Sequence, residues 1–326
     1  MSRLGPDRAH LLLRVSQLHY EQRLTQQEVG DRLHLTRWQV GRLLKEAHAK
    51  GIVRIEIVHP QGRDRQLENE LMAVADLAEA VVIPGTDDPV QTRQAVARAA
   101  GEYLADLAEP PGTLAVSWGR TMSDVASTIP SSWAQGTRVV QANGGLSRPG
   151  PGDPAAIITA LARQAGGSTV FLPAPAIVDS PELAAALRRE QSIAEVLRLA
   201  RSADVLLFSL GAVNHESVLV QSGCLRPADE EMLIVRGAVG DAVGRFLDAA
   251  GNAISPELEA RSIGLELSDV IDSRLAIAVA CGQDKWPVAQ ACLRRGLCDV
   301  LVTDSGTARH LTAVLAEQPK PVENPT

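Results

Sequence analysis

Apolar residues recur with two different spacings along the chain. Between residues 78 and 318, short apolar runs alternate with longer stretches in which apolar residues return every three or four positions. The first spacing is typical of buried strands and the second of amphipathic helices. Strands alternating with helices predict a mainly parallel, Rossmann-like α/β sheet with helices on both faces. Strands are expected at 80–83, 113–117, 138–142, 169–172, 205–210, 275–280 and 300–303, and helices at 89–108, 120–129, 153–165, 181–202, 285–296 and 305–316.

The N-terminal head, residues 1–59, shows the helical spacing in three short segments. A first helix is expected over 8–22. Thr25 and Glu28 form a Thr-x-x-Glu capping box that opens a second helix, and Thr36 caps a third. Two short capped helices that follow each other this closely predict a helix-turn-helix. Gly30 stands where alanine is favoured at the helix crossing, and His34 occupies a turn position that favours glycine.

The third helix carries the candidate DNA-binding residues. Arginine reads guanine through two hydrogen bonds, glutamine reads adenine in the same way, and arginine or lysine also binds phosphate. Trp38 is expected either to contact a sugar or thymine methyl group or to pack on the head's own core. A helical protein-interaction module is the alternative reading. The candidates are Thr36, Arg37, Trp38, Gln39, Arg42 and Lys45.

The charge distribution favours the DNA-binding reading. The whole chain has 32 Lys+Arg and 39 Asp+Glu, a formal charge of −7. Residues 1–65 contain ten Arg and two Lys against seven Asp+Glu, a net of +5, which leaves −12 for the remainder. A basic head on an acidic body indicates that the head meets a polyanion and the body does not.

The remaining segments complete the domain organisation. The 326 residues exceed what one compact core usually holds, so a large and a small domain are expected. Residues 52–58 alternate like a strand, and residues 60–77 read as a linker helix or a dimer contact. Residues 78–318 then form the effector-binding domain, followed by a tail over 319–326.

Small and polar residues follow the expected strands, where open parallel sheets bind ligands. The segment Ser117-Trp118-Gly119-Arg120-Thr121 follows the second strand and opens a helix. Glycine there, free helix amides, hydroxyls and a guanidinium would suit a phosphate group, although an ordinary strand-to-helix turn is equally compatible. Asn143-Gly144-Gly145, Gly211, Asp241 and Lys285 follow other strands. A carboxylate and an ammonium among amides and hydroxyls suit a polyol that bears a phosphate.

Several classes of function are disfavoured by composition. Aromatic residues make up 3% of the chain, too few for stacking platforms that bind single-stranded nucleic acid. No apolar run is long enough for a transmembrane helix, and residues 1–7 do not resemble a signal peptide, so a cytoplasmic protein with no membrane partner is expected. The four cysteines form no CxxC pair and no histidine lies at zinc-site spacing beside them. We therefore expect buried free thiols, and no metal or cofactor.

These motifs, taken in order, resemble the SorC family of bacterial transcription regulators, also described as SorC/DeoR-type sugar-binding regulators. The resemblance runs over about residues 10–316. It is carried by 24–29, 40–47 and 51–53 in the head and by 116–121, 140–145, 172–175, 237–241, 244–246 and 301–304 in the body. It implies an effector domain like sugar-phosphate isomerases and CoA transferases, a phosphorylated sugar or polyol as effector, and dimers or tetramers on an inverted-repeat operator.

The resemblance also supplies roles for the strand-end residues. It implies that residues 117–121 hold the effector phosphate and that Asn143–Gly145, Asp241 and Lys285 line the remaining pocket. Lys285 would bind phosphate or form a Schiff base, or would simply cap its helix. The full effector-binding set is Ser117, Trp118, Gly119, Arg120, Thr121, Gln141, Asn143, Gly144, Gly145, Gly211, Asp241, Arg245 and Lys285. A sugar-phosphate isomerase or deaminase with an appended head is the alternative, but the basic head favours a regulator without catalytic residues.

Overall fold

The computed structural model describes residues 6–53, 62–146, 152–214 and 217–317, and the chain divides into two compact units, residues 1–61 and 62–326. The small unit contains α1 (Pro6–Ser16), the π-helical turn η1 (Gln17–Glu21), α2 (Gln26–Leu33) and α3 (Arg37–Ala49). Both expected helix starts are present, because Thr25 and Thr36 each form a capping box with the residue three positions on. The three helices enclose a core of Leu12, Val15, Leu18, Val29, Val40, Leu43, Leu44 and Ala47.

Two unusual residues shape the turn between α2 and α3. A Cβ atom at Gly30 would lie 2.5 Å from the carbonyl oxygen of Leu35, so alanine does not fit at this crossing. His34 takes the left-handed conformation (φ 55°) at the end of α2, and its N–H donates to the carbonyl of Gly30. The expected strain at His34 is therefore present, and the glycine at residue 30 is what lets the chain turn this tightly.

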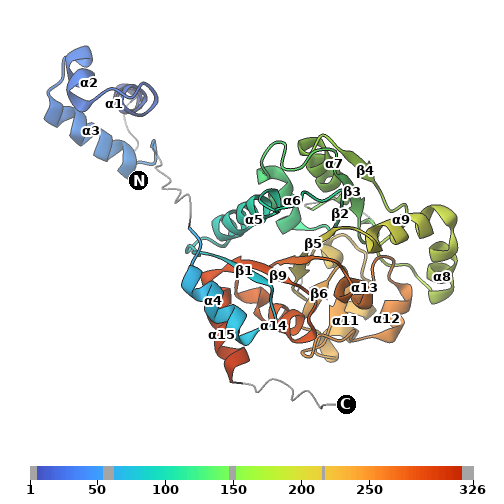
Figure 1. Cartoon of the computed structure of the whole chain (residues 1–326). Helices are drawn as coiled ribbons and strands as arrows, with labels where there is room; N and C mark the ends of the chain where they lie inside the picture. The colour runs from blue at the N-terminus through green and yellow to red at the C-terminus, as the bar shows by residue number, and fades with distance from the viewer. Residues whose placement is uncertain (1–5, 54–61, 147–151, 215–216, 318–326) are drawn as a thin grey trace. The chain divides into compact units, whose positions relative to one another are not determined.

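The large unit is built on a parallel sheet, as the alternation of strands and helices predicted. Seven parallel strands follow the order β1-β9-β8-β5-β2-β3-β4. Figure 1 shows this sheet passing through the middle of the unit. The strands are β1 (Glu79–Ile83), β2 (Thr113–Val116), β3 (Arg138–Gln141), β4 (Ser168–Val170), β5 (Val205–Gly211), β8 (Ala276–Val279) and β9 (Val300–Asp304).

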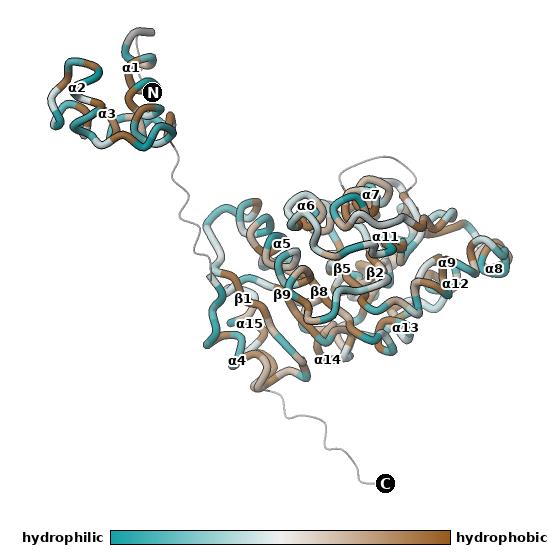
Figure 2. The backbone as a smooth tube through the Cα atoms, turned by 45° about the horizontal axis from the view of Figure 1, so that its top comes forward, coloured by the Kyte–Doolittle hydropathy of each residue, from teal (hydrophilic) through white to brown (hydrophobic). Residues whose placement is uncertain are grey.

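Helices cover both faces of the sheet because successive strand residues point to opposite sides. Leu114 and Val116 of β2 pack with α5 (Pro89–Ala105), α6 (Arg120–Thr128) and α7 (Pro154–Gln164). Ala115 joins the opposite layer. That layer contains α4 (Arg65–Val74), α9 (Gln191–Arg201), α14 (Trp286–Arg295) and α15 (Ser305–Ala316). Figure 2 shows that hydrophobic stretches concentrate in the strands between these layers.

The sequence did not predict the smaller elements between β5 and β8. A two-stranded hairpin, β6 (Gly240–Ala242) and β7 (Arg245–Leu247), pairs antiparallel with the end of β5. Its turn places Val243 at φ 48° and Gly244 at φ 78°, both left-handed.

The expected helix over 181–202 is interrupted at Glu190 between α8 (Pro181–Arg189) and α9. The remaining short helices are α10 (Val218–Gln221), α11 (Pro227–Val235), α12 (Pro256–Arg261) and α13 (Leu267–Ile271), and η2 (Gln283–Lys285) is a 3-10 turn.

The segment expected as a linker helix is part of the large unit. Leu67 and Leu71 of α4 are buried in its core. The buried Glu68 carboxylate accepts from the N–H of Val82 on edge strand β1, and Arg63 donates to Glu68. Helix α4 is therefore anchored to the sheet and is not a free connector. Most of the strand expected at 52–58 and the tail at 319–326 lie outside the described residues.

Candidate functional site

The strand order changes direction between β2 and β5, a switch point where parallel sheets carry a binding crevice. The chain leaves β2 toward β3 and β4, whereas β5 lies on the other side of β2, next to β8. Open parallel sheets bind ligands at such a switch point, at the carboxyl ends of the strands. Ser117 and Ser209 meet there, because the N–H of Ser209 donates to Oγ of Ser117 over 3.3 Å.

Helix α6 begins at this crevice without a side-chain cap. Its N-cap residue is Gly119 at φ 141°, which has no side chain to accept from the first amides. The described part of the following loop lies against it, since a Cβ at Gly152 would come 2.6 Å from the carbonyl carbon of Gly119. Arg120 and Thr121 form the first turn and are half-buried. An uncapped helix start with hydroxyl and guanidinium groups beside it is suited to an anion.

A carboxylate approaches the same edge from the hairpin. Asp241 on β6 pairs with Gly211 at the end of β5. A Cβ at Gly211 would lie 1.9 Å from Asp241 Oδ1, so glycine makes room for this carboxylate. Burial raises the pKa of Asp241 to about 6, against the opposing effects of Lys285 and of the N–H of Gly244, which donates to Oδ2 over 3.1 Å.

Lys285 stands at the start of α14, directly after the loop that follows β8. Its Nζ lies 3.5 Å from Asp284 Oδ2, and its side chain is about one-fifth exposed. The positive charge of Lys285 lowers the pKa of Asp241 and so offsets part of the effect of burial on that carboxylate. The Lys285 ammonium and the Asp241 carboxylate thus influence each other electrostatically, and their shared contact with an effector stays a prediction.

Asn143 supplies an unsatisfied acceptor. It follows β3, is 4% exposed, and forms an isolated bridge with Gly264. Its Oδ1 is buried and accepts no hydrogen bond from any residue that the structure describes. Buried amide oxygens are nearly always paired, so a ligand hydroxyl is a natural donor here.

Four of the predicted effector residues instead hold the loops in place. Trp118 donates its indole N–H to the carbonyl of Gly144 over 2.8 Å. Gln141 donates to Asn143 O and accepts from the N–H of Leu172, which uses both ends of its amide. A Cβ at Gly144 would collide with the carbonyl of Pro175, and Gly145 pairs with residues 174–176 of the same chain through its N–H and C=O. These contacts serve the protein backbone, so the four residues shape the loops of the site, and their expected contact with the effector stays a prediction.

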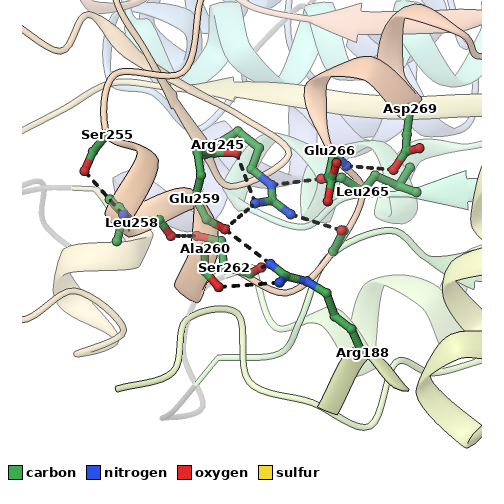
Figure 3. A network of polar contacts seen from close by, with 11 residues as sticks. Arg188, Arg245, Ser255, Leu258, Glu259, Ala260, Ser262, Leu265, Glu266 and Asp269 are labelled. Carbon is green, nitrogen blue, oxygen red and sulfur yellow. Dashed lines mark hydrogen bonds and ion pairs between the residues drawn. The ribbon is translucent and has the colours of Figure 1, made fainter. Parts of the chain in front are cut away.

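Arg245 also makes its contacts within the protein. It is 1% exposed, and its guanidinium donates to the carbonyls of Leu265 and Gly264 and to Glu259. Figure 3 shows Arg188 reaching the same segment from α8, where it donates to carbonyls of residues 259–262. The two arginines hold this segment, and Ile263 O in turn accepts from Gly144 N. The guanidinium of Arg245 is occupied by acceptors of the protein itself. It supports the Asn143–Gly145 loop indirectly, by holding the segment to which Gly144 is hydrogen-bonded.

The small unit has a groove of about 770 Å³ along α3. Five of the six predicted DNA-binding residues line it, namely Arg37, Trp38, Gln39, Arg42 and Lys45. His19, Tyr20 and His48 lie on the same groove, and Tyr20 Oη is 2.9 Å from His48 Nε2. Trp38 is 90% exposed, which excludes the alternative that it packs on the head's core.

Two of the six residues carry a structural task. Thr36 caps α3, and the Oε1 of Gln39 accepts from both N–H and Oγ of Thr36. In this arrangement Gln39 has only its amide N–H groups available, and its expected reading of adenine stays a prediction. Gly41 of α3 lies against α2, since a Cβ there would lie 3.2 Å from Gln26 Oε1.

The sequence reasoning missed Ser209 and Asp304. Ser209 is a polar residue within the apolar run of β5, and that position was the available signal. Asp304 ends β9 and is 6% exposed. In the sequence it stands out only as the last residue of the 301–304 motif, because nothing there shows which loops its carboxylate joins.

Comparison with known proteins places these features in a family. The family model described as "Putative sugar-binding domain" matches residues 59–313. This chain belongs to that family. The deoxyribonucleoside regulator of Bacillus subtilis (strain 168) is 30% identical over 94% of this chain and 98% of its own length. The transcriptional regulator LsrR of Enterobacter sp. (strain 638) is 31% identical over 93% of both chains.

A solved structure agrees with the fold. The structure of the full-length sorbitol operon regulator SorC from Klebsiella pneumoniae aligns over 94% of this chain and 99% of its own length. The TM-score is 0.69 and the sequence identity is 24%. The relatives are named as regulators, which leaves the isomerase or deaminase alternative without support. The family member described here is thus a ligand-responsive transcriptional regulator, and the expected family and α/β fold are confirmed.

Across the described ranges, the structure contains no helix that has both the length and the apolar character needed to span a bilayer. Within the same residues, no cluster of three or more histidine, cysteine or acidic side chains is arranged to hold a metal ion. All four cysteines are free, and three of them are buried.

Proposed function

We propose that this family member binds operator DNA through α3 and releases or engages it in response to a phosphorylated sugar or polyol bound at the β2–β5 crevice. We further propose that it works in the cytoplasm as a dimer or tetramer on an inverted repeat. The observation that carries the effector part is the convergence of the uncapped start of α6, the unpaired Asn143 Oδ1 and the Asp241–Lys285 pair on one sheet edge.

Each chemical group of such an effector has a matching partner. The amides at Gly119–Thr121 and the Arg120 guanidinium suit the phosphate. Asp241 and Asn143 offer acceptors for sugar hydroxyls, since a carboxylate and an amide oxygen both accept O–H donors. The Lys285 ammonium offsets the negative charge of the phosphate. Alternatively, the Lys285 amine condenses with an aldehyde carbon of the effector, with loss of water, to form a Schiff base.

A ligand screen on the full chain tests the effector. Melting temperature is measured with pairs of free and phosphorylated sugars and polyols, because a ligand that binds only the folded state raises it. A phosphorylated member should stabilise the protein and its free counterpart should not. Thr121→Ala should remove that shift, whereas Thr159→Ala, an exposed threonine on α7, should keep it. Equal stabilisation by free sugars would refute the phosphate role of residues 117–121.

For DNA, the groove on α3 places three cations beside an exposed indole. Arg37, Arg42 and Lys45 are all exposed and line the groove with Trp38. Cations bind phosphates and release counterions, so their loss should weaken DNA binding and reduce its salt dependence. Arg42→Ala should lower operator affinity roughly tenfold, in the range of about 1–3 kcal/mol for a good base contact. Arg14→Ala, the same charge change on α1, is the control, and unchanged affinity in Arg42→Ala would refute the placement of α3.

An effector can shift DNA affinity only if it binds the DNA-competent and incompetent arrangements differently. The two halves of this proposal are therefore linked by one measurement. Operator affinity is titrated with and without the stabilising effector, and the effector's own affinity is titrated with and without operator. The effector should change the operator affinity by the same factor by which the operator changes the effector affinity. A factor of one in both would show that the ligand bound at this crevice does not regulate DNA binding.

A further inference from the structure

Asp304 joins two loops at the edge of the candidate effector site. It ends β9, caps α15 and is 6% exposed. Its Oδ1 accepts from the N–H groups of Gly306 (2.9 Å) and Thr307 (3.0 Å), which is an ordinary helix cap. Its Oδ2 accepts from the N–H of Gly282 (2.9 Å) in the loop after β8 and from Thr307 Oγ1 (2.5 Å). One carboxylate therefore does more than cap its own helix.

Both contacts made by Oδ2 lead to Lys285. Gly282 starts the turn that Lys285 ends, and the N–H of Lys285 donates back to the carbonyl of Gly282 over 3.0 Å. On the other side, Thr307 Oγ1 accepts from the indole N–H of Trp286 over 3.1 Å. Trp286 directly follows Lys285, and its ring stacks on His310 with centroids 4.1 Å apart. The residues on both sides of Lys285 are thus tied to the first turns of α15.

We propose that Asp304 is a positioning residue, which together with Thr307 clasps the Gly282–Trp286 turn so that Lys285 faces Asp241 at the effector site. The role in effector binding rests on the proposed function, whereas the placement of Lys285 does not. A carboxylate is needed because both of its oxygens accept hydrogen bonds. In Asp304→Asn, one oxygen can still cap α15, but the amide NH2 would face the N–H of Gly282 and cannot accept from it.

The lysine content of the chain allows a direct test in the absence of effector. Lys285 is the only lysine among the described residues of the large unit, and Lys45 and Lys50 in the small unit provide internal references. The full chain is treated briefly with a water-soluble acetylating ester, and acetylation at each lysine is followed by mass spectrometry. Releasing the Gly282–Trp286 turn should expose Lys285. The acetylation rate of Lys285 should then rise at least threefold relative to that of Lys45.

Three variants separate position from charge and from folding. Asp304→Asn breaks the clasp and removes a charge, whereas Thr307→Val breaks the bridge to Trp286 and leaves the charge in place. Both should raise Lys285 acetylation, and Thr307→Ser should keep it near the wild-type rate. An increase in Asp304→Asn alone would assign the effect to charge and overturn the proposal, as would unchanged rates in both. If Asp304→Asn fails to fold, the Thr307 pair decides.

A second experiment tests whether the clasp acts on effector binding through Lys285. D-ribose 5-phosphate is the probe, and its dissociation constant is compared in wild type, Asp304→Asn, Lys285→Met and the double variant. Asp304→Asn should weaken binding several-fold in the wild-type background and have no effect in Lys285→Met. Equal weakening in both backgrounds would show a general structural role and overturn the proposal. If the probe does not bind the wild type, the proposed function fails for this ligand, and the acetylation ratios still decide the clasp.

Discussion

Gly211 and Asp241 form a matched pair in which the missing side chain of one residue makes space for the carboxylate of the other. They face each other on β5 and β6, and a Cβ at Gly211 would come within 1.9 Å of Asp241 Oδ1. The carboxylate is held over the end of β5 by the N–H of Gly244. A residue without a side chain thus determines where the main acidic group of the candidate site lies.

Gly211→Ala should therefore weaken effector binding without touching the effector. The added methyl group must displace the Asp241 carboxylate, and a displaced hydrogen-bond acceptor costs about tenfold in affinity, or ~1.4 kcal/mol. Isothermal titration with the effector identified by the melting screen measures the loss. Gly112→Ala, at the start of β2, is the control, because its Cβ would have ordinary room at 3.4 Å from Asp204. Unchanged affinity in Gly211→Ala would exclude Asp241 as an effector contact.

The raised pKa of Asp241 predicts a pH-dependent stability cost. Burial raises the pKa from its ordinary 3.8 to about 6, so the folded protein holds a proton on Asp241 between these values that the unfolded chain has lost. The cost of the charged carboxylate consequently develops as the pH rises from 3.8 to 6 and is complete above 6.

Asp241→Asn should remove that cost. Without effector, the variant should melt a few degrees above wild type at pH 8, and the difference should disappear at pH 3.5. Differential scanning calorimetry across this range checks both ends. A constant difference at every pH would mean that the gain has a cause other than titration of Asp241.

Trp38 should contribute to operator affinity and contribute little to the stability of the small unit. Its side chain is 90% exposed on α3, so Trp38→Ala removes little buried area, and the stability change should stay within about 0.5 kcal/mol. Operator affinity should fall at least several-fold, because the indole lines the groove beside Arg42 and Lys45. Hydrogen exchange of α1–α3 and a DNA titration on the same variant separate the two effects. Loss of protection in the small unit would show that Trp38 stabilises the fold after all.

A buried ion pair outside the candidate site makes a stability prediction. Arg261, 2% exposed, donates to both oxygens of Asp229 over 2.8 and 3.0 Å. Burial tends to raise the pKa of Asp229, but hydrogen bonds from Arg226 and Arg261 outweigh it and hold the pKa well below its ordinary value. Asp229→Ala leaves Arg261 buried without its partner and should cost about 3–5 kcal/mol in urea unfolding at pH 7.

The exposed partner of the same carboxylate provides the control. The Arg226 side chain is 45% exposed, so Arg226→Ala should cost less than about 1 kcal/mol. Because the pKa of Asp229 is lowered, its contribution is present above pH 3.8 and is lost as the pH falls below it. Similar costs for the two variants, or a cost for Asp229→Ala that persists in strong acid, would contradict the assignment.

The sequence by itself determined the elements that depend on local signals. The capping boxes at Thr25 and Thr36 are short-range hydrogen-bond patterns, and both are present in the structure. The strands follow the apolar runs to within one or two residues, because burial on both faces demands such runs. The small residues after β2 and β5 were found for the same reason, since strand ends can be located once the strands are known.

Only the tertiary structure decided which polar side chains face the site and which face the protein. Arg245, Gln141 and Trp118 carry groups that a ligand could use, but chain segments distant in sequence occupy those groups. Asp304 gained a role for the same reason, since its partner Gly282 lies 22 residues away. Long-range hydrogen bonds depend on how the loops are brought together in space. A single sequence shows which residue types are present but not which distant residues will be hydrogen-bonded to each other.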